Sequence, residues 1–325
     1  MKTLDATLAA IHADPANARG FILADARDAD MAFGLAAPGT DPVTGRPRSL
    51  ADYRDQMREV VRQGLVDIML MSASTNDVLT GEGLFSGSTV TPAVRANDST
   101  DIHVLAGATY SKQPPRPLRT PRIDEIMRGG TNLALYSITP VGDAERDALA
   151  LEAYRDFRAD AESAGLRHFL EVFPPNVPVP FQDVGRFLND FIARTLAGVP
   201  GPGRPVFLKM PYSGPRAMEE LVRYDPHLVP GVLGGSAGTT HDAFLLLQEA
   251  RRHGARAALF GRKIKQSEHQ LTFVRYLRAI ADDEIDAANA CRAYHADLGR
   301  LGVRPCRSLQ DDLQLTDPAL AQATC

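Results

Sequence analysis

The sequence predicts a single (β/α)8 TIM barrel of the α/β class, and three observations lead to this prediction. Eight short apolar runs alternate with longer, helix-like stretches along the chain. The runs lack strict polar alternation, which is typical of parallel strands buried on both faces. A length of 325 residues is one that α/β barrels use as a single domain. The predicted strands are 20–25, 66–72, 101–107, 132–138, 167–173, 205–211, 228–234 and 255–261.

The stretches between most of these strands have helical periodicity. In 49–65 the apolar side chains recur on one face, and Ser49 stands where a helix N-cap belongs. Gly165 and Gly254 end two of the other stretches, as glycine commonly does after a helix. The predicted helices are 49–65, 143–165, 181–198, 239–254 and 267–283.

An open doubly wound sheet is the alternative to the barrel. Such a sheet would lead us to expect a glycine-rich phosphate loop after the first strand, and residues 24–34, ADARDADMAFG, lack one. We therefore predict one barrel domain over residues 1–325, with no second domain. Residues 1–19 are expected to form a helical lead-in, and residues 300–325 a C-terminal extension.

Composition argues against several classes of protein. The net charge is −4 and no block of basic residues stands out, so we expect no nucleic-acid partner. The apolar runs are far shorter than a membrane span, and the N-terminus lacks the apolar segment of a secretory signal. The three cysteines form no CxxC pair, which indicates neither a disulfide framework nor a zinc site. We expect a cytoplasmic protein with reduced thiols.

Ionisable residues stand in or directly after three of the predicted strands. Asp25 ends the first strand and is followed by Arg27, Glu171 lies in the fifth, and Lys209 lies in the sixth. In a barrel, the chemistry sits where the strands end, so these side chains are candidate catalytic groups. The structural alternatives are that Asp25 caps the next element and that Glu171 and Lys209 form a structural ion pair.

The lysine is the most informative of these residues, because lysine is seldom buried without a partner and burying an ammonium group for packing alone is costly. Burial and nearby cations favour the neutral amine, which can add to a ketone and form an iminium. A carboxylic acid must then move protons during dehydration and bond cleavage. Lys209 and Glu171 on neighbouring barrel strands suit these two tasks.

The last two predicted strands run into glycine-rich loops that indicate an anion site. Glycine lets the backbone approach a phosphate, and the loops after strands seven and eight often bind phosphate in barrels. The candidate binding residues are Gly235, Ser236, Gly238, Gly261 and Arg262.

Five segments in this order resemble the class I, Schiff-base tagatose-bisphosphate aldolases and the related sulfofructosephosphate aldolases. The segments are ADARDADM, LEVF, FLKMP, GGSAG and FGRKI, and the resemblance extends roughly from residue 21 to residue 283. It implies a (β/α)8 fold and aldol cleavage of a phosphorylated ketose to dihydroxyacetone phosphate and an aldehyde. It also implies that the reaction needs neither a cofactor nor a metal.

The resemblance assigns a role to each matching residue. Lys209 would be the nucleophile and Glu171 the acid and base. Asp25 would orient substrate hydroxyls, and Arg27 would be a substrate-binding residue. The two glycine loops, with Ser236 and Arg262, would hold the phosphate.

The sequence departs from this family in two places. The family has a lysine early in strand four, where this chain has Asn132 or a neighbour, and a second arginine after the GR pair, where this chain has Lys263 and Lys265. The basic loop 111–122 could compensate for these losses, although such runs are often solvated. A hexose bisphosphate, a sulfosugar phosphate and a sugar with one anionic group all remain open as substrates.

Two other functions fit a barrel of this kind. A metal-dependent sugar isomerase or epimerase would need histidine and carboxylate ligands at several strand ends, and the eight histidines do not cluster there. A non-catalytic sugar-phosphate-binding barrel would need no buried lysine, so Lys209 discriminates between the alternatives. We expect a homo-oligomer whose partner is a small-molecule sugar phosphate, with no membrane association.

Overall fold

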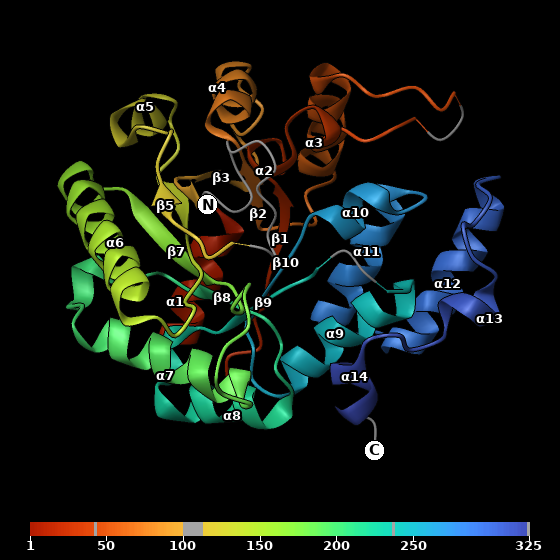
Figure 1. Cartoon of the computed structure of the whole chain (residues 1–325). Helices are drawn as coiled ribbons and strands as arrows, with labels where there is room; N and C mark the ends of the chain where they lie inside the picture. The colour runs from red at the N-terminus through yellow and green to blue at the C-terminus, as the bar shows by residue number, and fades with distance from the viewer. Residues whose placement is uncertain (42–43, 100–112, 236–237, 324–325) are drawn as a thin grey trace.

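The computed structural model describes residues 1–41, 44–99, 113–235 and 238–323. Its main feature is a sheet of eight parallel strands with helices packed around it (Figure 1). The strands are β1 Ile22–Arg27, β2 Ile68–Met71, β3 Thr91–Arg95, β6 Leu133–Ile138, β7 Arg167–Val172, β8 Leu208–Lys209, β9 Gly231–Leu233 and β10 Ala257–Phe260. A separate antiparallel pair joins β4 Asp98–Ser99 to β5 Pro117–Leu118.

The sheet curls into a nearly closed barrel, which confirms the predicted fold class. The strand order is β8-β7-β6-β3-β2-β1-β10-β9, so each strand neighbours the next barrel strand along the chain. The two edge strands meet through a parallel bridge between Met210 and Val232. Backbone hydrogen bonds from Met210 N to Gly231 O and from Leu233 N to Met210 O join the same edges.

The third position in the barrel is not held by the strand predicted for it. The third position in the barrel belongs to β3, which pairs with β2 on one side and β6 on the other, whereas residues 101–107 lie outside the described residues. Pro92 and Arg95 interrupt the apolar pattern of β3, so the more apolar run after it looked more like a strand. A buried arginine is tolerated in this strand because acidic side chains from elsewhere in the barrel neutralise its charge.

Helices follow most of the barrel strands, and several begin and end on local sequence signals. Ser49 and Asp52 form a reciprocal capping box at the start of α3, and Gly64 ends that helix in a left-handed conformation. Thr239 and Asp242 form the same box at the start of α9. The helices are α1 Thr3–Ala13, α2 Asp30–Phe33, α3 Leu50–Gln63, α4 Ala73–Gly81, α5 Ile123–Arg128, α6 Ala144–Ala164, α7 Val184–Ala197, α8 Pro215–Tyr224, α9 Thr240–Arg252, α10 Arg262–Gln266, α11 Gln270–Ala281, α12 Ala287–Arg300, α13 Leu309–Asp312 and α14 Pro318–Ala323. Short 3₁₀ helices span Gly34–Ala36, Gly201–Gly203 and Pro226–Leu228.

The barrel interior is apolar toward the start of the strands. Inward side chains such as Ile22, Ile68 and Phe169 form one buried cluster with Leu4 and Leu8 of α1. The N-terminal helix therefore closes the end of the barrel where the strands begin. Polar groups are left to the opposite end, where the strands finish and where barrels carry their chemistry.

The chain beyond residue 300 is partly helical. It forms α13 and α14, and α12 and α14 pack against α9 (Figure 1). Asp312 accepts a hydrogen bond from Thr240 N (2.8 Å), and Thr239 Oγ1 donates to Gln314 O (2.8 Å). These hydrogen bonds hold the extension against the start of α9, directly after the β9 loop. No helix within the described ranges is long and apolar enough to cross a membrane.

Candidate active site

Glu171 and Lys209 lie side by side at the end of the barrel where the strands finish. They are register partners on the adjacent strands β7 and β8, and Lys209 Nζ lies 2.5 Å from Glu171 Oε1. Both side chains are buried, with 8% of the lysine and 1% of the glutamate exposed. Phe169 and Phe207, two positions earlier on the same strands, stack on each other in the barrel interior. Side-chain alternation along the two strands therefore points Glu171 and Lys209 inward as well.

The second carboxylate oxygen of Glu171 is also held. Ser137 Oγ donates to Glu171 Oε2 at 2.6 Å, and Arg95 Nη2 donates to the same atom at 3.1 Å. Arg95 Nη1 in turn donates to Ser137 Oγ at 3.0 Å. Three donors from three strands thus fix the glutamate, which leaves its orientation little freedom.

Arg95 links this pair to Asp28, which follows β1. Its Nε donates to Asp28 Oδ2 at 2.5 Å, and both side chains are almost fully buried. Burial would raise the pKa of Asp28, but the charges of Arg95 and Lys209 outweigh it and hold the pKa below its usual value. Asp28, Arg95, Glu171 and Lys209 form a row of alternating charge in which two acids balance two bases. A neutral row of this kind lowers the cost of burying four ionisable groups together.

A pocket of about 420 Å³ opens above this row. Asp28, Arg95 and Glu171 form its polar wall, and Phe33, Phe173 and neighbouring apolar residues form another. Lys209 is not among the lining residues, but its ammonium group contacts Glu171, which is. The complete lining is Ala26, Asp28, Ala29, Ala32, Phe33, Arg95, Glu171, Phe173, Pro174, Leu233, Gly234, Gly235, Leu259, Gly261 and Arg262.

The loops after β9 and β10 form the remaining side of the pocket. A Cβ added to Gly261 would lie 1.9 Å from Ala26 O, so only glycine fits where this loop crosses β1. Gly235 has a positive φ of 59° and open space where a Cβ would be. Arg262 stacks over the Phe33 ring, 5.8 Å from its centroid, at the pocket rim. Ser236 lies outside the described residues.

Gly238 supports the β9 loop rather than lining the pocket. Its φ is 86°, and a Cβ there would lie 2.3 Å from Asp242 Oδ2 in the following helix. Lys263 Nζ donates to Gly238 O at 2.7 Å and so ties the β9 loop to the start of α10. The two glycine loops therefore form one connected unit.

Asp25 and Arg27 do not reach the pocket. Arg27 Nε donates to both carboxylate oxygens of Asp25, at 2.7 and 2.9 Å, and both side chains are fully buried. Arg27 also donates to Gln56 of α3 and to Gln270, the first residue of α11. The pair therefore occupies the helix-facing side of β1. This corrects their expected placement: residues 22, 24 and 26 face the barrel interior, and Asp28 continues that side.

No family model and no curated protein matches the chain. Solved structures of low sequence identity do match it. The fold is shared with solved aldolases. An archaeal fructose 1,6-bisphosphate aldolase superposes with a TM-score of 0.63 at 16% identity, covering 85% of this chain and 99% of its own. A Schiff-base-forming fructose-1,6-bisphosphate aldolase gives 0.64 at 19% identity with the same coverage.

A third similar structure is the Cgl0159 protein of Corynebacterium glutamicum, with a TM-score of 0.58 at 18% identity, covering 87% of this chain and 98% of its own. Identities this low establish a common fold and leave the chemistry to be argued from the residues. The barrel fold is thus shared with these structures, and the resemblance to tagatose-bisphosphate and sulfofructosephosphate aldolases stays a prediction.

Three polar residues of the candidate site were missed by sequence reasoning: Asp28, Arg95 and Ser137. Asp28 could have been found, because alternation from Ala24 and Ala26 places it on the inward side of the chain. Arg95 was not considered as a site residue, because the third barrel strand was predicted at other residues. Ser137 carries no sequence signal, because a serine near the end of an apolar strand is not distinctive.

Among the described residues, one group of histidine, cysteine and acidic side chains is arranged to hold a metal ion. It consists of Cys291, His295 and Asp312 on α12 and α13, and none of the three lines the pocket. The polar wall of the pocket itself is made of two carboxylates neutralised by Arg95 and Lys209. That arrangement favours acid–base and amine chemistry over metal coordination at this place.

Proposed function

We propose that this protein is a class I aldolase that cleaves a phosphorylated ketose through a Schiff base on Lys209. The products are dihydroxyacetone phosphate and an aldehyde, and the substrate is a hexose bisphosphate or a sulfosugar phosphate. The observation that carries the proposal is the buried contact of 2.5 Å between Lys209 Nζ and Glu171 Oε1 beside a pocket with glycine loops. The shared fold with Schiff-base aldolases supports it.

The pair supplies the proton transfers that imine formation needs. Lys209 passes a proton to Glu171 across their hydrogen bond, and the neutral amine attacks the substrate ketone. One proton moves from the nitrogen to the oxygen of the carbinolamine. Glu171 then protonates the resulting hydroxyl group, which leaves as water and yields the iminium. Ser137 and Arg95 keep the carboxyl group directed at this position throughout.

Carbon–carbon cleavage follows from the iminium. The bond between the carbons α and β to the iminium carbon breaks, and its electrons move toward the nitrogen. A carboxylate must remove the proton of the hydroxyl on the β carbon, which becomes the carbonyl oxygen of the aldehyde. We assign this step to Glu171, with Asp28 orienting the substrate hydroxyls in the role first given to Asp25. Protonation of the enamine and hydrolysis of the new iminium release dihydroxyacetone phosphate and restore Lys209.

The phosphate of the substrate is proposed to lie between the β9 and β10 loops. Gly235 and Gly261 line the pocket without side chains that would keep an anion from the backbone, and Arg262 adds a positive charge to the lining. Gly238 and Lys263 hold the loops together. Ser236 remains a proposed ligand of the same anion.

The proposal is tested by reductive trapping. The protein is incubated with dihydroxyacetone phosphate, reduced with borohydride, digested, and the modified peptide is identified by mass. We expect the adduct on Lys209, and none in Lys209→Met, whose circular dichroism should match the wild type. Lys265→Met is the matched control, because that lysine lies on α10, donates to Ala37 O rather than to the glycine loops, and should leave the adduct on Lys209 in place. An adduct on Lys112, Lys263 or Lys265 instead would exclude Lys209 as the nucleophile.

A further inference from the structure

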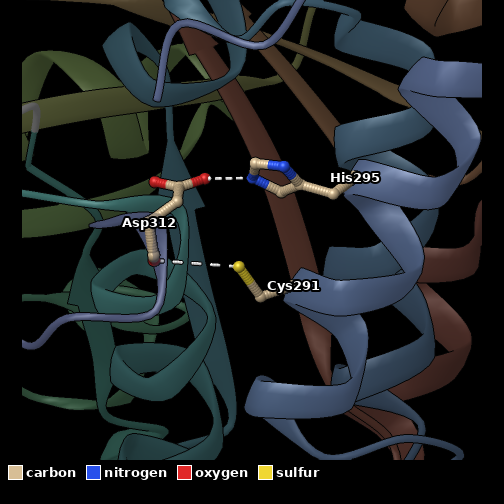
Figure 2. A group of neighbouring side chains, drawn as sticks. All are labelled: Cys291, His295 and Asp312. Atoms are coloured by element: carbon tan, nitrogen blue, oxygen red, sulfur yellow. Dashed lines mark hydrogen bonds and ion pairs between the residues drawn. The ribbon is translucent and has the colours of Figure 1, made fainter. Parts of the chain in front are cut away.

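Three side chains of different chemistry meet between α12 and the C-terminal extension. Cys291 and His295 lie one helical turn apart on α12, and Asp312 approaches them from α13 (Figure 2). His295 Nε2 is 2.9 Å from Asp312 Oδ2, and Cys291 Sγ is 3.7 Å from Asp312 O. One ligand atom from each residue lies within 4.8 Å of the other two. All three side chains are more than nine-tenths buried.

The chemistry of this trio suits one class of ion. A thiolate, an imidazole and a carboxylate together are the ligand types that zinc accepts, and zinc bonds of about 2.0–2.3 Å hold such atoms a few ångströms apart. The i, i+4 spacing of Cys291 and His295 places two ligands on one face of a helix, as in other helical zinc sites. The charges also balance, because a thiolate and a carboxylate together cancel a divalent ion inside a buried site.

We propose that Cys291, His295 and Asp312 bind one zinc ion. The three protein ligands leave a fourth position for water. Coordination breaks the S–H bond, the sulfur electron pair binds the ion, and the proton passes to solvent. No oxidation or reduction takes place.

The place of the cluster gives the ion a structural role. Asp312 uses its other oxygen, Oδ1, to accept the hydrogen bond from Thr240 N, and Arg307 Nη1 lies 3.9 Å from the same oxygen. Thr240 begins α9, which follows the β9 loop. A zinc ion would therefore fix the extension to α12. Through Asp312 it would also stabilise the start of α9, the helix that follows the β9 loop. Lys209 and the pocket take no part in this binding.

The inference is tested on tag-free, full-length protein that has been stripped with a chelator and exchanged into metal-free buffer. We expect one equivalent of zinc per chain to remain bound after desalting and to raise Tm. Cobalt(II) in place of zinc should give thiolate-to-cobalt charge-transfer absorption in the near ultraviolet. Absence of both stoichiometric zinc and this absorption in the wild-type protein would show that the trio is only a hydrogen-bonded contact, and would overturn the proposal.

Two cysteine variants locate the sulfur ligand. Cys291→Ser should lose the charge-transfer absorption and weaken zinc binding by more than about 100-fold. Replacing a residue that only hydrogen-bonds to a metal ligand typically weakens metal binding by about 10–100-fold. Cys306→Ser is the control, since Cys306 is an exposed thiol of the same segment and should leave both signals unchanged. Absorption that persists in Cys291→Ser would contradict the assignment. If Cys291→Ser does not fold, loss of the absorption in Cys306→Ser would contradict it equally.

Discussion

Arg95 of β3 donates to Glu171 of β7 across the intervening strand β6, with 3.1 Å between Nη2 and Oε2. The same guanidinium group also donates to Asp28, which follows β1, so one side chain links residues from opposite sides of β3. Ser137 of β6 fills the gap between the two strands and donates to the same glutamate oxygen. This contact explains how two buried carboxylates can face one pocket without repelling each other.

Replacing Glu171 by glutamine tests its proposed proton transfer. Glutamine keeps the shape and much of the hydrogen bonding but cannot exchange the proton, so kcat should fall by about 10²–10⁴-fold with KM little changed. The structural alternative is an ion pair that only holds Lys209, and breaking a buried pair costs roughly 3–5 kcal/mol. Both kcat and Tm should be measured. A strongly destabilised variant whose folded fraction turns over at the wild-type rate would make Glu171 structural.

The effect of Arg95 on Asp28 predicts how stability depends on pH. Because the pKa of Asp28 is lowered in the folded protein, its contribution to stability is present above the unfolded pKa, near 3.8. That contribution is lost as pH falls through the lower, folded pKa. Arg95→Met removes the main partner charge and should raise the pKa of Asp28, so the free-energy difference between wild type and variant should shrink on acidification below about pH 4. Urea unfolding at several pH values measures it, and a constant difference would contradict the link.

Arg262 is expected to contribute binding rather than chemistry. Arg262→Ala removes an interaction common to the ground and transition states, so KM for a phosphorylated ketose should rise with kcat little changed. Hydrogen bonds to charged groups contribute about 1.5–3 kcal/mol, which corresponds to roughly a 10- to 150-fold effect. The comparison is the same kinetics with the unphosphorylated sugar. A variant that still discriminates between the two substrates as the wild type does would place the phosphate elsewhere.

Catalysis should be independent of metal. In the proposed mechanism, Lys209 and Glu171 supply the electron sink and the proton transfers, so exhaustive EDTA treatment should leave kcat unchanged at temperatures well below Tm. Activity is measured before and after treatment, with Cys291→Ser as a control for any loss of structural zinc. Activity that is lost in both proteins and restored by manganese, magnesium or zinc would favour an isomerase or a metal-dependent aldolase.

The sequence by itself determined the barrel and its most important pair. Short apolar strands, caps and glycines are local signals, and they placed seven of the eight barrel strands close to where the structure has them. Strand order in a barrel follows chain order, so Glu171 and Lys209 had to be neighbours once strands five and six were recognised. The glycine loops were recognisable for the same reason, because backbone conformation and close approach demand glycine locally.

Only the tertiary structure decided which side of β1 faces the pocket and what holds the glutamate. Strands buried on both faces carry no polar alternation, and a shift of one residue moves a side chain to the other face. Asp25 and Arg27 therefore read as pocket residues although they face the helices, while Asp28 and Arg95 went unnoticed. The partners of Arg95 come from β1, β6 and β7, and those of Cys291 and His295 from α13. The contacts of Arg95 exist only once the barrel has closed, and those of α12 with α13 only once the C-terminal extension has folded back, so no local pattern encodes them.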